Sequence, residues 1–160
     1  MQVREIMTIA PVTVGESTPV VEVARQLLAH QLPGLPVVDP QGRLLGMVTE
    51  EDLIMRNANL RLPHFLTILD ALIPTDAHEF DEEVRRMLAT SAAEVMTSRP
   101  PIVSPDDDVA DAATLMVEHH LNPVPVVENE RVVGLLTRRD IVRLMLREED
   151  AAAGVADTRI

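Results

Sequence analysis

Two short segments of the sequence each place a hydroxyl and a carboxylate beside an expected helix start. Thr49 and Asp52 are three residues apart, as are Thr137 and Asp140, and each pair follows an aliphatic run. Residues three apart lie on one face of a helix, so the two side chains of each pair would meet on its first turn. Free backbone N–H groups at such a turn can receive a phosphate. A plain helix cap explains the same spacing, and both interpretations stay open at this point.

The residues inside the two pairs differ in charge. Glu50 and Glu51 separate the first pair, whereas Arg138 and Arg139 separate the second. Negative charge repels a phosphate, and positive charge attracts it. We therefore expect the second pair to hold phosphate more strongly, with Arg138 or Arg139 near it.

These pairs belong to an internal repeat, which shows as self-similarity at a nearly constant offset. Three segments of the first half return 88 or 89 positions later, namely Glu5-Ile6-Met7-Thr8 as Glu94-Val95-Met96-Thr97, Pro36-Val37-Val38 as Pro125-Val126-Val127, and Gly46 to Asp52 as Gly134 to Asp140. Each half is near the size at which a hydrophobic core alone supplies little stability. We therefore expect one module made of two copies.

Each copy has the pattern of an α/β unit with the element order β-α-β-β-α. Short apolar runs bounded by turn residues indicate strands, and apolar residues at helical spacing indicate helices. Strands are expected at residues 12–14, 35–38, 44–48, 102–103, 124–127 and 132–136, with helices that begin at Thr18-Pro19, Thr49, Asp106-Asp107-Asp108 and Thr137. We interpret the aspartate run as a helix cap rather than a cation site, because carboxylates there complement the helix dipole.

Residues 57–91 form an insert between the copies. Its apolar residues have helical spacing and form a stripe that either completes this subunit's core or covers a partner subunit; they are Phe65, Ile68, Leu69, Leu72, Phe80, Val84, Met87 and Leu88. Ser91 and Glu94 then have capping-box spacing. The expected organisation is a first unit at residues 1–56, a helical insert at 57–91, a second unit at 92–146 and a flexible tail at 147–160.

The composition argues against several classes of function. The 160 residues carry a net charge of −12, whereas nucleic acids are bound by clustered lysine and arginine. The absence of cysteine removes disulfides, thiolate nucleophiles and Cys-ligated metal sites. No apolar run is long enough for a signal peptide or a membrane span. We therefore expect a cytoplasmic protein that contacts neither nucleic acid nor membrane.

The histidines and glycines show no catalytic pattern. No HExxH element, Ser-His-Asp arrangement or glycine-rich phosphate loop is present. His30 and His119 occupy equivalent positions near a helix end, where histidine suits the dipole. His119 and His120 are neighbours that point in different directions on a helix, which disfavours a metal pair. We expect no enzyme activity, no metal and no catalytic cofactor.

The repeated Met-Thr, the Pro-Val-Val and above all the Gly-apolar-apolar-Thr-x-x-Asp element resemble the CBS (cystathionine beta-synthase) domain family. The resemblance covers residues 3–56 and 92–146, and two ordered copies are similar to a tandem pair, or Bateman module. It implies two units packed face to face about a pseudo-twofold axis, with two clefts that bind AMP, ADP, ATP or S-adenosylmethionine in many members. It also implies a homodimer.

The resemblance further implies a role for each pair. Asp52 and Asp140 would accept hydrogen bonds from the ribose hydroxyls, and Thr49 and Thr137 would contact ribose or phosphate. The adenine would lie against mainly aliphatic walls, which are Thr13, Val14, Leu35, Pro36 and Val37 in one cleft and Ile102, Val103, Val124, Pro125 and Val126 in the other. The charge difference makes the cleft of the second copy the better nucleotide site.

We therefore expect a regulatory protein that binds an adenine nucleotide and transmits the change to a partner protein whose identity is unknown. A competing hypothesis is a structural or dimerisation scaffold in which the Thr-Asp pairs are only helix caps. A sensor of S-adenosylmethionine and a divalent-cation sensor that uses the acidic surface are two further hypotheses.

Overall fold

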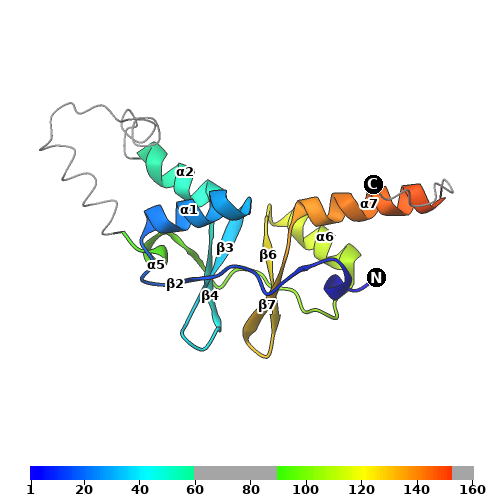
Figure 1. Cartoon of the computed structure of the whole chain (residues 1–160), viewed down its shortest axis with the longest axis horizontal. Helices are drawn as coiled ribbons and strands as arrows, with labels where there is room; N and C mark the ends of the chain where they lie inside the picture. The colour runs from blue at the N-terminus through cyan, green and yellow to red at the C-terminus, as the bar shows by residue number, and fades with distance from the viewer. Residues whose placement is uncertain (60–89, 153–160) are drawn as a thin grey trace, which may run out of the picture. The chain divides into compact units, whose positions relative to one another are not determined.

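The computed structural model describes residues 1–59 and 90–152 (Figure 1). These residues divide into two compact units, a first unit of residues 12–59 and 90–100 and a second unit of residues 1–11 and 101–152. Each unit combines one sheet with helices, so the predicted α/β class is confirmed. The compact units and the sequence repeat have different boundaries, because the N-terminal residues fold with the second copy.

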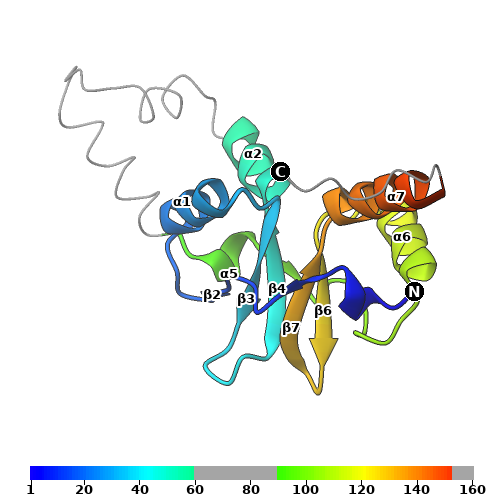
Figure 2. The same ribbon diagram turned by 45° about the vertical axis from the view of Figure 1, so that its right-hand side comes forward.

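The first unit is built on a four-stranded sheet with the strand order β2-β3-β4-β5. Strand β2 is parallel to β3, and the other neighbouring pairs are antiparallel. Helices α1 and α2 lie side by side in both ribbon views (Figures 1 and 2). The elements in chain order are β2 (Val14–Gly15), α1 (Val20–His30), β3 (Gly34–Val38), β4 (Leu44–Thr49), α2 (Glu50–Asn59), α5 (Ala92–Val95) and β5 (Thr97–Ser98).

The second unit is built on a three-stranded antiparallel sheet with the strand order β1-β7-β6. Val103 adds a single parallel bridge to Val126 of β6. Helices α6 and α7 contact each other, as α1 and α2 do in the first unit. The elements are a short 3-10 helix η1 (Val3–Glu5), β1 (Thr8–Ile9), α6 (Val109–Glu118), β6 (Val124–Glu128), β7 (Arg131–Leu136) and α7 (Arg138–Ala152).

Each unit has its own aliphatic core. Leu35 and Val37 are alternate residues of β3, so both face the core side of the sheet. Val23 and Leu27 are one turn apart on α1 and meet them there. The second core repeats this arrangement with residues of β6, β7 and α6 and their neighbours, namely Val3, Val103, Val109, Ala112, Met116, Val124, Val126 and Leu136. The predicted hairpins and amphipathic helices are thus confirmed.

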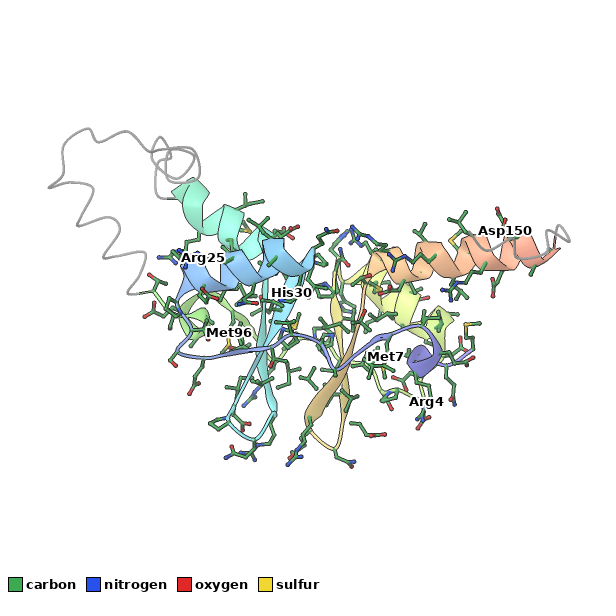
Figure 3. The ribbon with its side chains drawn as sticks, in the orientation of Figure 1. Arg4, Met7, Arg25, His30, Met96 and Asp150 are labelled. Atoms are coloured by element: carbon green, nitrogen blue, oxygen red, sulfur yellow. The ribbon has the colours of Figure 1, made fainter. Side chains whose placement is uncertain are left out.

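The two Met-Thr elements are exchanged between the copies. Met7-Thr8 of the first copy lies beside Gly134 of the second, and Met96-Thr97 of the second copy lies beside Gly46 of the first. Strand β1 of the first copy pairs with β7, and β5 of the second copy pairs with β4. A Cβ atom on Gly134 would lie 2.5 Å from Met7 Sδ, and one on Gly46 would lie 2.6 Å from Met96 Sδ. The two glycines therefore leave the space that the two methionines occupy. Figure 3 labels both methionines.

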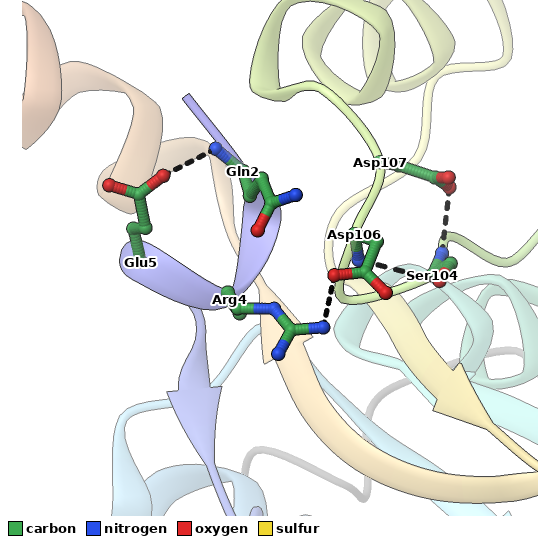
Figure 4. A network of polar contacts seen from close by, with 6 residues as sticks. All are labelled: Gln2, Arg4, Glu5, Ser104, Asp106 and Asp107. Atoms are coloured by element: carbon green, nitrogen blue, oxygen red, sulfur yellow. Dashed lines mark hydrogen bonds and ion pairs between the residues drawn. The ribbon is translucent and has the colours of Figure 1, made fainter.

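Polar contacts also hold the N-terminal segment to the second unit (Figure 4). The Val3 N–H donates to the Asp107 carbonyl at 2.9 Å, and the Arg4 N–H donates to the Pro105 carbonyl at 2.9 Å. The Arg4 guanidinium forms an ion pair with the Asp106 carboxylate. Together with the β1–β7 pairing, these contacts explain why residues 1–11 fold with the second unit.

The aspartate run before α6 is a helix start, as predicted. Asp108 is the N-cap residue, and its Oδ1 accepts the Ala110 N–H at 2.8 Å. That hydrogen bond holds the pKa of Asp108 below its ordinary value. Asp107 Oδ2 accepts the Ser104 N–H at 2.7 Å, which braces the preceding turn. Asp107 and Asp108 are thus engaged in local structure, whereas the Asp106 carboxylate pairs with Arg4.

Two sequence expectations about the helices are wrong in detail. Helix α1 has Pro19 rather than Thr18 at the N-cap position, and the Thr18 hydroxyl accepts the Gly15 N–H at 3.1 Å instead. Helix α7 continues to Ala152, so residues 147–152 are helical and do not belong to a flexible tail. Arginine, glutamate and alanine are good helix formers, which explains this extension.

The start of α5 follows the sequence prediction, because the Glu94 carboxylate accepts the Ser91 N–H at 3.2 Å. The apolar pattern predicted between Phe65 and Leu88 lies outside the described residues. Within the described ranges, no helix is both long and apolar enough to cross a membrane.

Candidate functional site

The first Thr-x-x-Asp pair joins the end of β4 to the start of α2. Thr49 is the last residue of the strand, and α2 begins at the next residue. Asp52 Oδ2 accepts both the N–H and the hydroxyl of Thr49, each at 2.8 Å. The Asp52 N–H donates in return to Thr49 Oγ1 at 3.2 Å. The two residues thus close a reciprocal helix cap.

The second pair has the same geometry between β7 and α7. Asp140 Oδ2 accepts the Thr137 N–H at 2.8 Å and the Thr137 hydroxyl at 2.7 Å. The Asp140 N–H donates to Thr137 Oγ1 at 3.3 Å. Both residues are only 8% exposed. The repeated sequence motif is therefore a repeated structure, and the helix-cap interpretation of both pairs is confirmed.

Each motif carboxylate keeps one oxygen outside the cap. Asp140 Oδ1 has the Arg143 guanidinium at 3.6 Å, which is ion-pair distance rather than hydrogen-bond distance. Asp52 Oδ1 accepts no hydrogen bond from any described residue. Every fully buried side-chain nitrogen and oxygen in the described part of the chain has a hydrogen-bond partner, so an oxygen without one there is at least partly accessible. A ligand hydroxyl can therefore donate to Oδ1 while the cap stays closed.

Most backbone N–H groups in the first turns of α2 and α7 already donate to an acceptor within the protein, although the sequence predicted that they would be available to a phosphate. The Arg138 N–H donates to the Asn122 side-chain oxygen at 3.1 Å, and the equivalent Glu50 N–H donates to the Pro33 carbonyl at 3.0 Å. The N–H of each motif aspartate is already part of the cap. On α7, the Arg139 N–H is the first-turn donor for which the described residues supply no acceptor. A phosphate there would meet one backbone donor and the arginine side chains.

The side chains between each threonine and aspartate are exposed and oppositely charged in the two units. Arg138 and Arg139 project from the start of α7, and Glu50 and Glu51 project from the start of α2. None of the four forms an ion pair with another residue in the described part of the chain. Their charges are therefore available to a ligand at either motif.

Most side chains of the expected adenine walls are buried in this structure. Ile102 is 50% exposed and Thr13 is also exposed, so these two side chains remain accessible. The other side chains of the set are buried; they are Val14, Leu35, Pro36, Val37, Val103, Val124, Pro125 and Val126. A base next to these strands would meet their main-chain atoms.

Two residues that support the second motif were not singled out from the sequence. Asn122 orients the first turn of α7 through its side-chain oxygen, and Arg143 approaches the motif carboxylate. Arg143 lies three residues after Asp140, a spacing that permits an ion pair on a helix. Asn122 occupies the repeat position of Pro33, so a polar side chain replaces proline there. The Asp140–Arg143 spacing and the change from proline to Asn122 are visible in the sequence. Such features are common in proteins, so they do not by themselves indicate a functional residue.

His30 and His119 belong to helix ends and not to the two Thr-x-x-Asp motifs. His30 is the last residue of α1, and His119 follows α6 as its C-cap, so both occupy helix ends as expected. No cluster of three or more His, Asp or Glu side chains among residues 1–59 and 90–152 is arranged to hold a metal ion.

Comparison with known proteins identifies relatives of this fold. The Methanocaldococcus jannaschii protein MJ1426 is 30% identical over 155 residues, which are 91% of this chain and 92% of that protein. The Arabidopsis thaliana protein CBSX2, whose crystal structure is a complex with AMP, is 25% identical with a TM-score of 0.70; the match covers 92% of this chain and 98% of that chain.

A second solved relative carries different adenosine compounds. The CBS domain pair of protein MJ0100 was crystallised with 5′-methylthioadenosine and S-adenosyl-L-methionine. It is 26% identical, with a TM-score of 0.72 over 92% of this chain and 98% of that chain. The family model of the CBS domain matches two segments here, residues 3–59 and 92–147. The chain therefore belongs to the CBS domain family and contains a tandem pair of CBS domains.

Proposed function

We propose that this chain is a regulatory module that binds an adenosine compound of the AMP, ADP and ATP class at its Thr-x-x-Asp motifs. The observation that carries the proposal is the Oδ1 atom of Asp52 and of Asp140, which lies outside a closed helix cap in both units. The AMP complex of CBSX2 and the adenosyl complex of MJ0100 support this ligand class.

The motif residues have separate roles in this proposal. Oδ1 of each aspartate accepts ribose hydroxyls, while the threonine fixes that carboxylate through the cap. At α7, the Arg139 N–H and the guanidinium groups of Arg138 and Arg139 attract the phosphate. Base contacts come from main-chain atoms of the strands, with Thr13 and Ile102 beside them. The second unit is then the stronger nucleotide site.

Regulation requires that the ligand bind one conformation better than another, because only differential affinity shifts a population. We propose that the chain has no catalytic role and no catalytic cofactor, and that it acts as a cytoplasmic homodimer. A partner protein would respond to the ligand-bound conformation.

One observation favours a second candidate, a scaffold without a ligand. The Thr-Asp pairs form complete helix caps by themselves, so the motifs have a structural role even in the absence of a nucleotide. In that case, the two motifs would stabilise α2 and α7 and nothing more.

A thermal-shift screen with AMP, ADP, ATP, S-adenosylmethionine and magnesium chloride separates these candidates. A ligand at 100 times its Kd stabilises the folded state by about 2.7 kcal/mol. For a protein of this size, that stabilisation raises Tm by roughly 5 to 10 °C. No shift with any compound at millimolar concentration would favour the scaffold, and a shift with magnesium alone would favour a cation sensor.

A further inference from the structure

We propose that the two motifs select ligands by opposite charge. The second unit would take an adenosine compound with an anionic 5′ substituent, and the first unit would take one with a cationic 5′ substituent. This inference rests on the proposed function and adds the ligand class of each motif.

The start of α7 carries an excess of positive charge. Arg138 and Arg139 are exposed and have no ion-pair partner among the described residues. Arg143 lies one turn further along, with its Nη1 atom 3.6 Å from Asp140 Oδ1. Three guanidinium groups thus accompany one carboxylate. The helix dipole adds a partial positive charge at the start of α7 and of α2 alike, so it does not distinguish the two motifs. This turn favours a phosphate.

The start of α2 carries an excess of negative charge. Glu50, Glu51 and Asp52 are consecutive carboxylates in its first turn. Met55 occupies the position of Arg143, so no guanidinium faces the Asp52 carboxylate from there. The next arginine, Arg56, donates from Nη2 to the Thr90 hydroxyl at 2.5 Å. This turn opposes a phosphate and favours a cation.

The hydrogen-bond geometry of the two motifs is nearly identical, so it cannot discriminate between ligands. The three Thr–Asp distances are 2.8, 2.8 and 3.2 Å in the first unit and 2.8, 2.7 and 3.3 Å in the second. The same ribose contact is therefore possible at both. A ribose held by the motif carboxylate brings its 5′ substituent close to the first turn, where the charges differ. Charge then decides which adenosine compound each unit prefers.

Single-motif variants allow each unit to be measured alone. Asp52→Asn leaves the second motif active, and Asp140→Asn leaves the first, because an asparagine oxygen can replace Oδ2 in the cap while its NH2 group removes the ligand acceptor. The probes are AMP, uncharged 5′-methylthioadenosine and the sulfonium S-adenosylmethionine, titrated by calorimetry at low salt. We expect the affinity order AMP, methylthioadenosine, S-adenosylmethionine for Asp52→Asn and the reverse order for Asp140→Asn.

Charge reversal provides the matched controls. In the Asp140→Asn background, Glu50→Arg with Glu51→Arg should raise the affinity for AMP relative to S-adenosylmethionine by roughly 10- to 100-fold. In the Asp52→Asn background, Arg138→Glu with Arg139→Glu should lower the same ratio by a similar factor. Added salt should weaken the binding of AMP and of S-adenosylmethionine and leave methylthioadenosine unchanged, because screening acts on charge.

The possible outcomes distinguish this inference from the function on which it rests. The same affinity order in both single-motif variants, or charge reversals without effect on the ratio, overturns the charge selection while the binding function stands. Loss of all binding in Asp140→Asn alone also overturns it, since the first unit then has no site. Failure of the wild-type chain to bind any of the three probes overturns the proposed function as well.

Discussion

Gly134→Ala tests the packing of the N-terminal Met-Thr element on β7. The new Cβ atom would lie 2.5 Å from Met7 Sδ and 3.1 Å from the Thr8 carbonyl oxygen. Ordinary contacts are about 3.5 to 4.0 Å, so the methionine must move by roughly 1 Å. Overpacking of this kind costs about 1 to 3 kcal/mol, which the lower entropy of the unfolded alanine chain offsets by about 0.4 to 1 kcal/mol. Gly134 does not have a positive φ, so backbone strain adds nothing.

The expected loss of stability is therefore about 0.5 to 2 kcal/mol, or a fall in Tm of roughly 1 to 8 °C. Urea unfolding of Gly134→Ala, Met7→Ala and the double variant measures it. Because Met7→Ala removes the atoms that the new methyl group meets, the double variant should be more stable than the sum of the single effects by about 0.5 to 2 kcal/mol. Met96→Ala is the matched control and should combine with Gly134→Ala additively, within about 0.5 kcal/mol.

Two results would contradict this packing. Coupling of Gly134→Ala to Met96→Ala rather than to Met7→Ala would mean that each Met-Thr element packs on its own copy. Additivity with both methionines would mean that neither occupies the space above Gly134.

Two further predictions concern stability. The Arg43 N–H and guanidinium bind the Asp39 carboxylate and lower its pKa. The charged form thus adds stability above the ordinary aspartate pKa of about 3.9, and this stability is lost as the pH falls through the lowered value. Asp39→Asn should therefore lower Tm at pH 7, and the difference should close in a Tm series below about pH 4; a constant difference contradicts this. Leu27→Ala should cost about 2 to 5 kcal/mol in urea unfolding, whereas its exposed neighbour Leu28→Ala should change stability by about 0.5 kcal/mol or less; equal effects would contradict the assignment of Leu27 to the core.

The repeat, the hairpins and the helix starts could be predicted from sequence because each depends on neighbouring residues. Thr49 and Asp52 form a cap through a spacing of three, which the sequence displays directly. The aliphatic runs of β3 and β6 are strands because β-branched and aliphatic residues between turn residues favour a half-buried extended chain. The prediction that these elements bind an adenosine compound came from the resemblance to CBS domains and not from the residues alone.

The faces of the strands and the partners of the short strands could not be predicted in this way. Leu35 and Val37 are two residues apart on β3, so their side chains lie on the same face of the sheet, and that face is the core. The resemblance to CBS domains identified this segment of the chain, but it did not indicate which face of the strand is buried. Strand β1 is only two residues long, so its sequence is too short to predict which copy it pairs with. The pairing partner of β1 is determined by contacts between residues far apart in the sequence. Gly134 is the residue that indicates this pairing, because a glycine there leaves space for Met7.

Calorimetric titration of AMP into the wild-type chain and into the Asp52→Asn/Asp140→Asn double variant tests the ligand role of the motifs most directly. The double variant keeps both caps, so its Tm should stay near that of the wild type, while the loss of the Oδ1 acceptors should weaken AMP binding by roughly 10- to 150-fold. Equal affinity of a folded double variant and the wild type for AMP would contradict the proposed role of Asp52 and Asp140.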